Sequence, residues 1–370
     1  MKNRSALALC LAIPLFGASG GAYRVALPGF RYEFPRDHFN HPEFRTEWWY
    51  YTGNLHTPQG RRFGFELTFF RQGVDRDTPS SSVWDVRDIW MAHLALSDID
   101  GGRFLQTERL NRSGAGTAGA DVRQASVWNG NWQARFDLDL QAPGAVASQE
   151  LQAVADQFSL QLSLRSKKPP VIHGEHGISQ KSEGRGRASH YVSFTRLPTN
   201  GIVTLEGKQF VVDGLSWMDH EFFTSQLDSN QIGWDWFSLQ FDDGSDLMLF
   251  RLRRNDGSID RYSAGTYVDP RGRTTHLAAA NFSLVAGKTW TSPDSGGRYP
   301  IEWTVRVPAL GLQASLRTRL GQQELTGRTP ARPPYWEGAV ESSGTKNNTP
   351  VKGVGYVEMT GYSGRARIGN

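Results

Sequence analysis

The sequence predicts an all-β protein of short antiparallel strands. Asn-Gly and Asp-Gly turns recur at short spacing, as at residues 129–131, 242–244 and 255–257, and such pairs between apolar runs are strong hairpin signals. The runs between the turns, such as "WMAHLALSDI" and "EWTVRV", alternate apolar and polar residues, which is the period of a strand. Only residues 148–160 have a helix-like composition, and the end of that segment already alternates.

Length and composition set the class of protein. The chain of 370 residues is long enough for two or three domains, each with its own core. Hydrophobic residues make up 38% and aromatic residues 12%, including 12 Trp, which is not the composition of a disordered chain. The net charge is only +4 and its cations are spread along the chain. We therefore expect no nucleic-acid partner.

The first residues have the pattern of an export signal. Lys2 and Arg4 precede an apolar stretch at residues 6–16 that is too short to span a bilayer, and small residues follow. This predicts a cleavable signal peptide over residues 1–22 and a periplasmic or secreted protein. No later segment is apolar enough to predict a membrane span.

The single cysteine lies inside the predicted signal. Removal of residues 1–22 would take Cys10 with it and leave a chain without a thiol. Lipid anchoring through Cys10 is disfavoured, because Leu9 is large where a lipoprotein signal needs a small residue.

A weak internal echo suggests two related units. The segment "WWYYTGNL" at residues 48–55 aligns without gaps to "WDWFSLQF" at residues 234–241, and each precedes a Gly-containing turn and another alternating strand. This favours a two-barrel or two-sandwich architecture. Barrels of about eight strands can hold one small ligand.

Several motifs fail on their context. The "GAGTAG" loop at residues 114–119 follows no buried strand, "DIDGG" lacks the Glu that ends a calcium loop, and "HEFFT" lacks the second His of a zinc protease. The "HGEH" segment at residues 173–176 could supply two metal ligands but lies between loop-like sequences. No serine elbow or phosphate loop is present. We therefore predict no cofactor and no metal.

The "TEWWYY" stretch carries large rings on both faces of a predicted strand. Alternation places Glu47, Trp49 and Tyr51 on one face and Trp48, Tyr50 and Thr52 on the other. One face would pack in a core and the other would line a space. We expect the face of Glu47 to look towards a cavity or a domain junction.

A second stretch, "GLSWMDHEFF" at residues 214–223, combines acids with aromatic residues. If extended, it places Trp217, Asp219 and Glu221 on one face and Met218, His220 and Phe222 on the other. A carboxyl group beside Trp suits a general acid, because desolvation raises its pKa. The alternative, also open for Glu47, is a carboxylate that accepts Tyr or Trp hydrogen bonds and closes a barrel end.

Further aromatic and acidic residues lie towards the C-terminus. Glu337, Glu341 and Glu358 alternate with aromatic residues in segments that we expect to form a closing pair of strands. The "GWDWF" motif adds Trp234 and Trp236, which are either core residues or part of a pocket wall.

These motifs resemble one known family. The segments "TEWWYYTGNL", "WMAHLALSDIDGGRF", "GLSWMDHEFF", "GWDWFSLQF" and "YWEGAVESSG" resemble the AttH-like, carotenoid 1,2-hydratase-related proteins, often labelled predicted secreted hydrolases, over about residues 32–362. The resemblance implies two lipocalin-like antiparallel β-barrel domains in tandem. We expect them at residues 23–222 and 223–370.

The resemblance also implies a chemistry. The carotenoid hydratases add water across an isoprenoid double bond, and an Asp in an aromatic setting is thought to protonate the alkene. Asp219 is similar to that residue, with Trp217 as its aromatic companion. The local "MDHEF" followed by "FTSQL" departs from those enzymes, and with the export signal it argues against that particular reaction.

Two main hypotheses follow, with a third behind them. The first is a hydratase or lyase acting on an apolar, isoprenoid-like or lipid-like molecule, with Asp219 as the acid and Glu47 and His220 as its partners. Its predicted ligand-binding residues are Trp49, Tyr51, Trp217, Trp234, Trp236 and Glu221. The second is a non-catalytic carrier of a hydrophobic small molecule. The third is a metal-independent hydrolase whose water is activated by Asp219 or Glu221.

Overall fold

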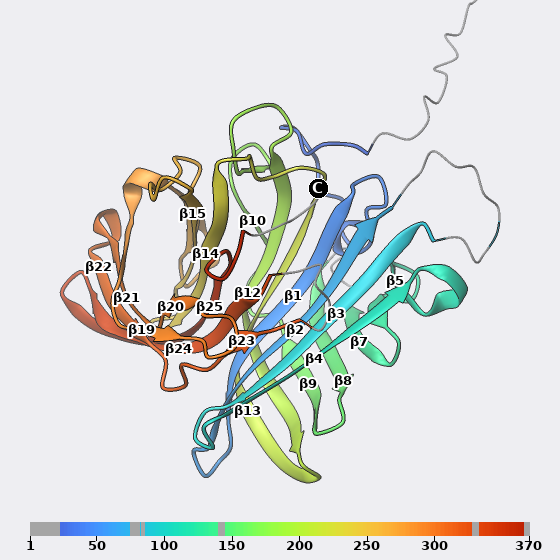
Figure 1. The fold of residues 1–370 in the computed structure, drawn as a ribbon, viewed down its shortest axis with the longest axis horizontal. Coiled ribbons are helices and arrows are strands. Elements are labelled where there is room, and N and C mark those ends of the chain that lie inside the picture. Colours follow the sequence, from blue (N-terminus) through green and yellow to red (C-terminus); the bar gives the residue numbers. More distant parts are fainter. Residues whose placement is uncertain (1–22, 75–81, 83–85, 140–144, 328–332, 366–370) are drawn as a thin grey trace, which may run out of the picture.

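A computed structural model describes residues 23–74, 82, 86–139, 145–327 and 333–365 (Figure 1). Apart from short 3-10 turns, the regular elements in these ranges are strands, which confirms the all-β prediction. The helix-like segment at residues 148–160 divides between two strands. The predicted signal peptide at residues 1–22 lies outside the described residues.

The N-terminal half forms one curved antiparallel sheet. Its strands lie in the order β4-β3-β2-β1-β13-β12-β9-β8-β7-β6-β5, with short β10 and β11 also paired to β12. Their bounds are β1 (Thr46–His56), β2 (Arg62–Gly73), β3 (Asp88–Asp98), β4 (Arg103–Arg112), β5 (Ala118–Asp121), β6 (Ser126–Asn129), β7 (Trp132–Leu138), β8 (Val146–Val154), β9 (Phe158–Arg165), β10 (Val171–Ile172), β11 (Ser179–Gln180), β12 (Ala188–Leu205) and β13 (Lys208–Phe223).

The C-terminal half forms a second curved sheet. Its order is β17-β16-β15-β14-β25-β24-β22-β21-β18, with β23 paired to β24 and a separate β19–β20 hairpin. The bounds are β14 (Gln231–Phe241), β15 (Asp246–Arg254), β16 (Ala264–Val268), β17 (Thr274–Ala278), β18 (Ser283–Ala286), β19 (Thr289–Thr291), β20 (Arg298–Pro300), β21 (Glu302–Val307), β22 (Leu312–Arg317), β23 (Glu324–Leu325), β24 (Tyr335–Lys346) and β25 (Thr349–Met359).

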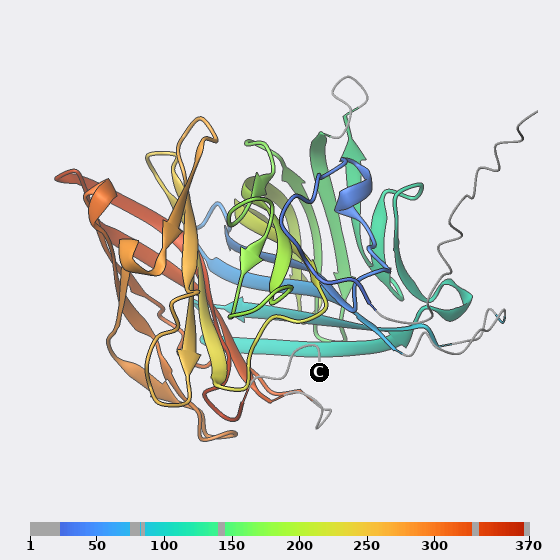
Figure 2. The same ribbon diagram turned by 90° about the horizontal axis from the view of Figure 1, so that it is seen from above.

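Both sheets follow one scheme. Each opens with a four-stranded meander, and its first strand then pairs with its last, β1 with β13 and β14 with β25. The aromatic strands of the sequence echo, β1 and β14, therefore occupy equivalent positions. One sheet is a nearly closed barrel and the other a half-barrel (Figure 2), which confirms two tandem lipocalin-like units.

Each sheet buries one face in its own core, and part of its other face lies against the partner sheet. Trp49 and Phe65 belong to the N-terminal core, and Phe237 and Trp303 to the C-terminal core. A third cluster, which includes Tyr50, Tyr191, Trp217, Trp236 and Phe250, draws its residues from both sheets. Burial of such rings contributes about 1.5–3 kcal/mol each, so this contact stabilises one arrangement of the two units.

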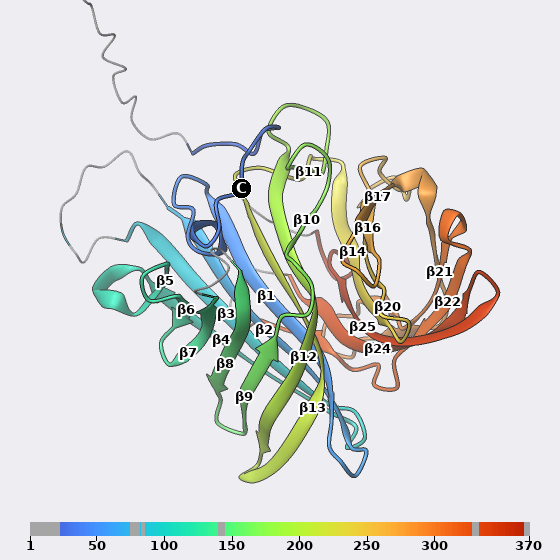
Figure 3. The same cartoon turned by 180° about the vertical axis from the view of Figure 1, so that it is seen from behind.

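Contacts between strands locate the junction. Strand β1 lies against β25, β2 against β24 and β12 against β14. The long strands β12 and β13 lie on the side of the N-terminal sheet that turns towards the C-terminal one (Figure 3). A buried ion pair adds specificity, because the Asp246 carboxylate of β15 accepts from Lys168 Nζ at 2.6 Å and from Arg196 Nε at 2.9 Å.

No helix within the described ranges is long and apolar enough to cross a membrane.

Candidate functional site

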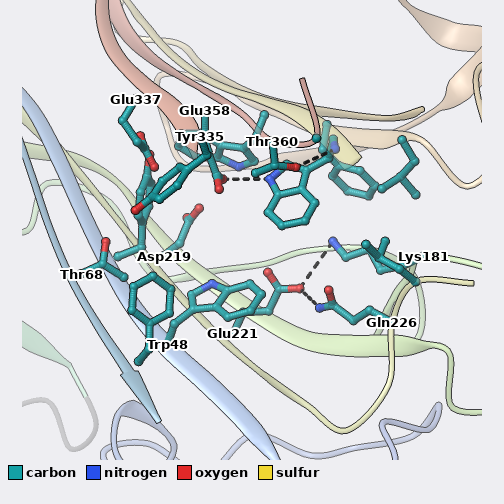
Figure 4. Close-up of a pocket in the computed structure, with 18 of the residues that line it drawn as sticks. Trp48, Thr68, Lys181, Asp219, Glu221, Gln226, Tyr335, Glu337, Glu358 and Thr360 are labelled. Carbon is teal, nitrogen blue, oxygen red and sulfur yellow. Dashed lines mark hydrogen bonds and ion pairs between the residues drawn. The ribbon is translucent and has the colours of Figure 1, made fainter. Parts of the chain in front are cut away.

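A pocket lies at the junction of the two sheets (Figure 4). Its cavity volume is about 110 Å³. Residues from β1, β2, β12 and β13 form one wall, and residues from β14, β15, β24 and β25 form the other. The lining comprises Trp48, Tyr50, Thr68, Phe70, Lys181, Tyr191, Asp219, Glu221, Gln226, Leu227, Trp234, Trp236, Phe250, Leu252, Pro333, Pro334, Tyr335, Glu337, Glu358, Thr360 and Gly361.

Strand register explains why these side chains meet. Tyr50 lies directly opposite Asp219, and Trp48 lies opposite Glu221. Directly opposed residues point to the same face, so both acids face outwards from the N-terminal barrel beside aromatic rings. On the facing sheet Trp236 is opposite Glu358, which repeats the pairing of an acid with a ring.

Asp219 is held by three donors. Its Oδ1 accepts from Trp217 Nε1 at 2.6 Å and from the Ser193 hydroxyl, and its Oδ2 accepts from the Tyr191 hydroxyl at 2.6 Å. Trp236 Nε1 donates to the same Tyr191 oxygen at 2.9 Å. The carboxyl group is thus fixed at the wall by residues of both sheets.

Burial dominates the protonation of Asp219. Desolvation raises its pKa from 3.8 to about 7, although hydrogen bonds from Ser193, Tyr191 and Trp217 oppose the rise. A carboxyl group with a pKa near 7 can hold a proton at neutral pH and release it to a substrate. Asp219 therefore has the character of a general acid.

A second acid, Glu221, faces a buried lysine at the other side of the pocket. Lys181 Nζ lies 3.5 Å from Glu221 Oε1 and 3.8 Å from the centre of the Phe250 ring. Gln226 Nε2 donates to the same Oε1 at 2.5 Å. Burial lowers the pKa of Lys181, while the charge of Glu221 acts against that change.

The facing sheet adds two more acids. Tyr50 donates to Glu337 Oε2 at 2.8 Å, and Trp234 Nε1 donates to Glu358 Oε2 at 2.9 Å. Burial raises the pKa of Glu337 well above its usual range, and the charges of Glu358 and Glu66 add to the rise. The pocket thus holds two protonatable acids on opposite walls, Asp219 and Glu337.

The expected orientation of Glu47 needs correction. The strand places Glu47, Trp49 and Tyr51 on one face as predicted, but that face is the inner one. Glu47 is fully buried, while Trp49 and Tyr51 pack in the N-terminal core. The other face carries Trp48 and Tyr50 to the pocket. Both faces are rich in rings because both are buried, so composition did not tell them apart.

The remaining predicted residues divide between the two faces of β13 and the wall of β14. Glu221, Trp234 and Trp236 line the pocket beside Asp219. Trp217 lies just behind that wall, edge-on to Trp236 at 6.1 Å. His220 points to the inner face instead, stacked on Trp49 at 4.8 Å. The catalytic and ligand-binding roles of all these residues stay predictions.

Glu47 belongs to a buried charge network. His41 Nδ1 and His220 Nε2 each lie 2.8 Å from Glu47 Oε1, and Arg71 Nε donates to Oε2 at 3.1 Å. Burial alone would lower the pKa of His41, but the charge of Glu47 and the hydrogen bonds of Asp37 and Glu47 raise it to about 9.

The same three residues, His41, Glu47 and His220, are of types that bind metals, and their ligand atoms lie within 4.8 Å of one another. Their separations of 2.8 Å are those of hydrogen bonds. The Arg71 guanidinium, fully buried, also occupies the second carboxylate oxygen. We interpret this cluster as an ion-pair network that holds β1, β2 and β13 together.

Sequence reasoning missed several pocket residues. Lys181 comes from a loop after β11 with no motif around it, and its pairing with Glu221 spans 40 residues of chain. Glu337 and Glu358 lie on a closing pair of strands, as expected, yet both face the pocket. The equivalence of residues 48 and 50 to residues 234 and 236 in the internal echo could have identified Trp48 and Tyr50.

These features define a class of protein: two tandem lipocalin-like β-barrels with an aromatic, acid-lined pocket between them. A model of the AttH-like family matches residues 25–362. The chain belongs to this family. The crystal structure of a protein assigned as AttH from Nitrosomonas europaea has a TM-score of 0.77 at 33% identity, covering 92% of this chain and 99% of that one.

Two fungal relatives are named for reactions that add or remove water. The dehydratase asqC of Emericella nidulans is 23% identical over 220 residues, which is 56% of this chain and 60% of the relative. Kievitone hydratase of Fusarium solani subsp. phaseoli is 26% identical over 165 residues, 44% of this chain and 46% of the relative. The matches thus span less than two thirds of either relative.

Proposed function

We propose that this protein is a hydro-lyase-type enzyme that adds or removes water on an apolar small molecule bound in the pocket between the barrels. Asp219 is the acid. The observation that carries the proposal is a buried carboxyl group, with its pKa raised by desolvation to about 7, in the wall of an aromatic cavity.

The proton transfers balance with one carboxyl group. In the hydration direction, the Asp219 O–H protonates one carbon of a double bond, and the neighbouring carbon becomes a cation. Water adds to that carbon and releases one proton, which equals the proton that Asp219 must regain to become neutral again. In the dehydration direction Asp219 protonates a hydroxyl group, which leaves as water, and the carboxylate then takes a proton from the adjacent carbon.

The aromatic wall supports this chemistry. Trp48, Trp234 and Trp236 line the same pocket as the acid, and aromatic rings stabilise a desolvated cation by about 2 kcal/mol or more. The two fungal relatives are named as a dehydratase and a hydratase, and these names support the same reaction class for this protein. The apolar lining favours an isoprenoid-like or lipid-like substrate.

The contacts of Ser193 do not favour a serine hydrolase. Its hydroxyl donates to the Asp219 carboxylate, and His173 Nδ1 faces the Thr266 hydroxyl at 2.8 Å instead of a carboxylate. A nucleophilic serine needs the opposite order, with the acid behind the histidine. An exported location follows from the predicted signal peptide and is part of the proposal.

The test starts from the ligand. Native mass spectrometry on protein purified from its own host, followed by extraction, identifies a co-purifying small molecule. That compound is incubated in heavy-oxygen water with wild type, Asp219→Asn and the exposed control Asp213→Asn.

We expect wild type and Asp213→Asn to produce or consume one water per molecule and to exchange heavy oxygen. Asp219→Asn should bind the compound without turnover. Turnover by Asp219→Asn would overturn the assignment of the acid, and binding without chemistry in wild type would favour a carrier.

A further inference from the structure

Asp219 is the end of a chain of buried polar side chains that leads away from the pocket. The Ser193 hydroxyl contacts Asp219 Oδ1 on one side and lies 2.7 Å from His173 Nε2 on the other. His173 Nδ1 lies 2.8 Å from the Thr266 hydroxyl. Ser193, His173 and Thr266 are all buried, and Thr266 belongs to the C-terminal sheet, so the chain crosses the domain junction.

Backbone pairing holds these residues in place. Ser193 lies directly opposite Asp219 in the β12–β13 ladder. The backbone N–H of His173 donates to the Tyr191 carbonyl at 2.9 Å, and the centres of the His173 and Tyr191 rings lie 4.3 Å apart. None of these residues needs to move for a proton to pass.

The number of protons available fixes which group donates in each hydrogen bond between Asp219 and Thr266. A hydroxyl group has one proton to donate. While Ser193 donates to ionised Asp219, it must accept from His173, so His173 carries its proton on Nε2 and accepts from Thr266 on Nδ1. When Asp219 is protonated on Oδ1, every bond reverses and His173 carries its proton on Nδ1.

We propose that Ser193 and His173 form a proton relay that returns protons to Asp219 from the C-terminal sheet through Thr266. The inference rests on the proposed role of Asp219 as the acid. Ser193 and His173 act through Asp219 and are positioning residues. The two oxygens of Asp219 divide the work, because Oδ1 faces the relay and Oδ2 faces Tyr191 of the pocket wall.

Each transfer moves one proton, and the series balances when Thr266 takes up a proton from outside the relay as it gives its own to His173. The Ser193 proton passes to Asp219 Oδ1, the His173 Nε2 proton passes to Ser193, and the Thr266 proton passes to His173 Nδ1. His173 changes tautomer without becoming a cation. This agrees with its burial, which lowers the pKa of His173 to about 3.

A half-buried histidine, His276, lies beside the far end of the relay, directly opposite Thr266 in the β16–β17 ladder but without a hydrogen bond to it. Within the described part of the chain, its Nδ1 is buried and has no hydrogen-bond partner. Directly opposed side chains have Cβ atoms about 4.5–5.5 Å apart. His276 is therefore placed to resupply Thr266.

The other ionisable groups near the relay are few. Tyr191, Glu221 and Lys181 surround the carboxyl group, and Lys181 and His276 influence the imidazole. The titration of Asp219 must be distinguished from titrations of these groups. A transition that is absent from Asp219→Asn belongs to Asp219.

Nitrogen-15 NMR of the whole protein tests the relay without a substrate. The Trp217 indole N–H reports the titration of Asp219, because it donates to Oδ1. The His173 ring nitrogens report the tautomer. We expect His173 to switch from the Nδ1–H to the Nε2–H tautomer as pH rises through the Asp219 transition, at neutral charge throughout.

Ser193→Ala should abolish the tautomer switch while Trp217 still reports a titration. The matched control is Ser189→Ala, another buried serine of β12, whose hydroxyl has no hydrogen-bond partner among the described residues. It should leave the switch unchanged. A switch that persists in Ser193→Ala overturns the relay.

Wild type alone also decides the question if the variants fail to fold. A His173 tautomer that stays constant while Trp217 titrates overturns the relay and leaves Asp219 as an acid. A Trp217 signal that stays constant between about pH 5 and 9 removes the acid itself. The two failures are therefore distinguishable.

Discussion

The Tyr50 hydroxyl donates a hydrogen bond of 2.8 Å to Glu337 Oε2 and thereby joins the first strand of the N-terminal sheet to the C-terminal sheet. The two residues are 287 positions apart in the chain, and both line the pocket. The pocket is thus closed on one side by a bond between the barrels, and its shape depends on how the two sheets dock.

Tyr50→Phe should lower the free energy of unfolding by about 1–3 kcal/mol, because it leaves a buried carboxyl group without its donor. Urea denaturation measures the change. The matched control is Tyr51→Phe, whose hydroxyl bonds Gln149 Oε1 at 2.7 Å inside the N-terminal barrel, and its cost should be similar. Destabilisation by Tyr51→Phe alone would mean that water replaces the Tyr50 bond and that the junction is open.

The free energy of unfolding of Asp219→Asn, relative to that of wild type, should increase as pH rises. The folded protein holds a proton on Asp219 up to a pKa of about 7, whereas the unfolded chain releases it near 3.8. Wild type therefore loses stability between these values as pH rises, by about 4 kcal/mol in total, and Asn does not.

Urea unfolding of both proteins at about pH 4 and pH 8 measures this difference. Asp213→Asn, an exposed change on the same strand, serves as the control and should show no such trend. An equal stability difference between Asp219→Asn and wild type at both pH values would show that Asp219 titrates normally.

Glu47→Gln should destabilise the protein by about 3–5 kcal/mol, because Arg71 and His41 lose one of the two carboxylates that balance their buried charges. Glu33→Gln, whose side chain is 72% exposed, should change the stability by less than about 0.5 kcal/mol. We also expect the Trp217 signal of Glu47→Gln to report an unchanged Asp219 titration, since Glu47 lies on the inner face. A shifted Asp219 titration would instead connect Glu47 to the site.

Two titrations, of Glu47 and of His41, make the stability that this network contributes depend on pH. The pKa of Glu47 is held below its ordinary value of 4.5 by His41, His220 and Arg71 against the opposing effect of burial. Its contribution is present above pH 4.5 and is lost as pH falls. The raised pKa of His41 adds stability that is complete below 6.5 and is lost as pH rises through about 9. Glu47→Gln should reduce both dependences in urea titrations, and unchanged dependences would contradict the network.

Leu227→Trp should fill the pocket and prevent ligand binding, because Leu227 lines the cavity and Trp is much larger. Indole is a suitable uncharged probe, and saturation-transfer NMR detects its binding. We expect at least about tenfold weaker binding, equivalent to about 1.4 kcal/mol. Val211→Trp, at a position 67% exposed on β13, should bind as wild type does. Undiminished binding by Leu227→Trp would place the ligand site elsewhere.

Local sequence was sufficient for the strands and for their two faces. Alternation grouped Trp217 with Asp219 and Glu221, and the structure keeps that grouping because a β-strand reverses its side chains at every residue. The echo of residues 48–55 in residues 234–241 identified two equivalent strands for the same reason. Turn pairs and periodicity act within a few residues, so they can be read from the chain without knowledge of the fold.

Tertiary packing decided the rest. Closure of the N-terminal sheet turned Glu47 to the interior, where it contacts Arg71 and His220, 24 and 173 residues further along the chain. Docking of the two barrels then enclosed Trp48 and Tyr50, on the opposite face, in the pocket. It also brought Lys181, Glu337 and Glu358 beside Asp219. A strand that is buried on both faces has no polar side to mark the outside, so only the packing of one sheet against the other could determine which face met the cavity.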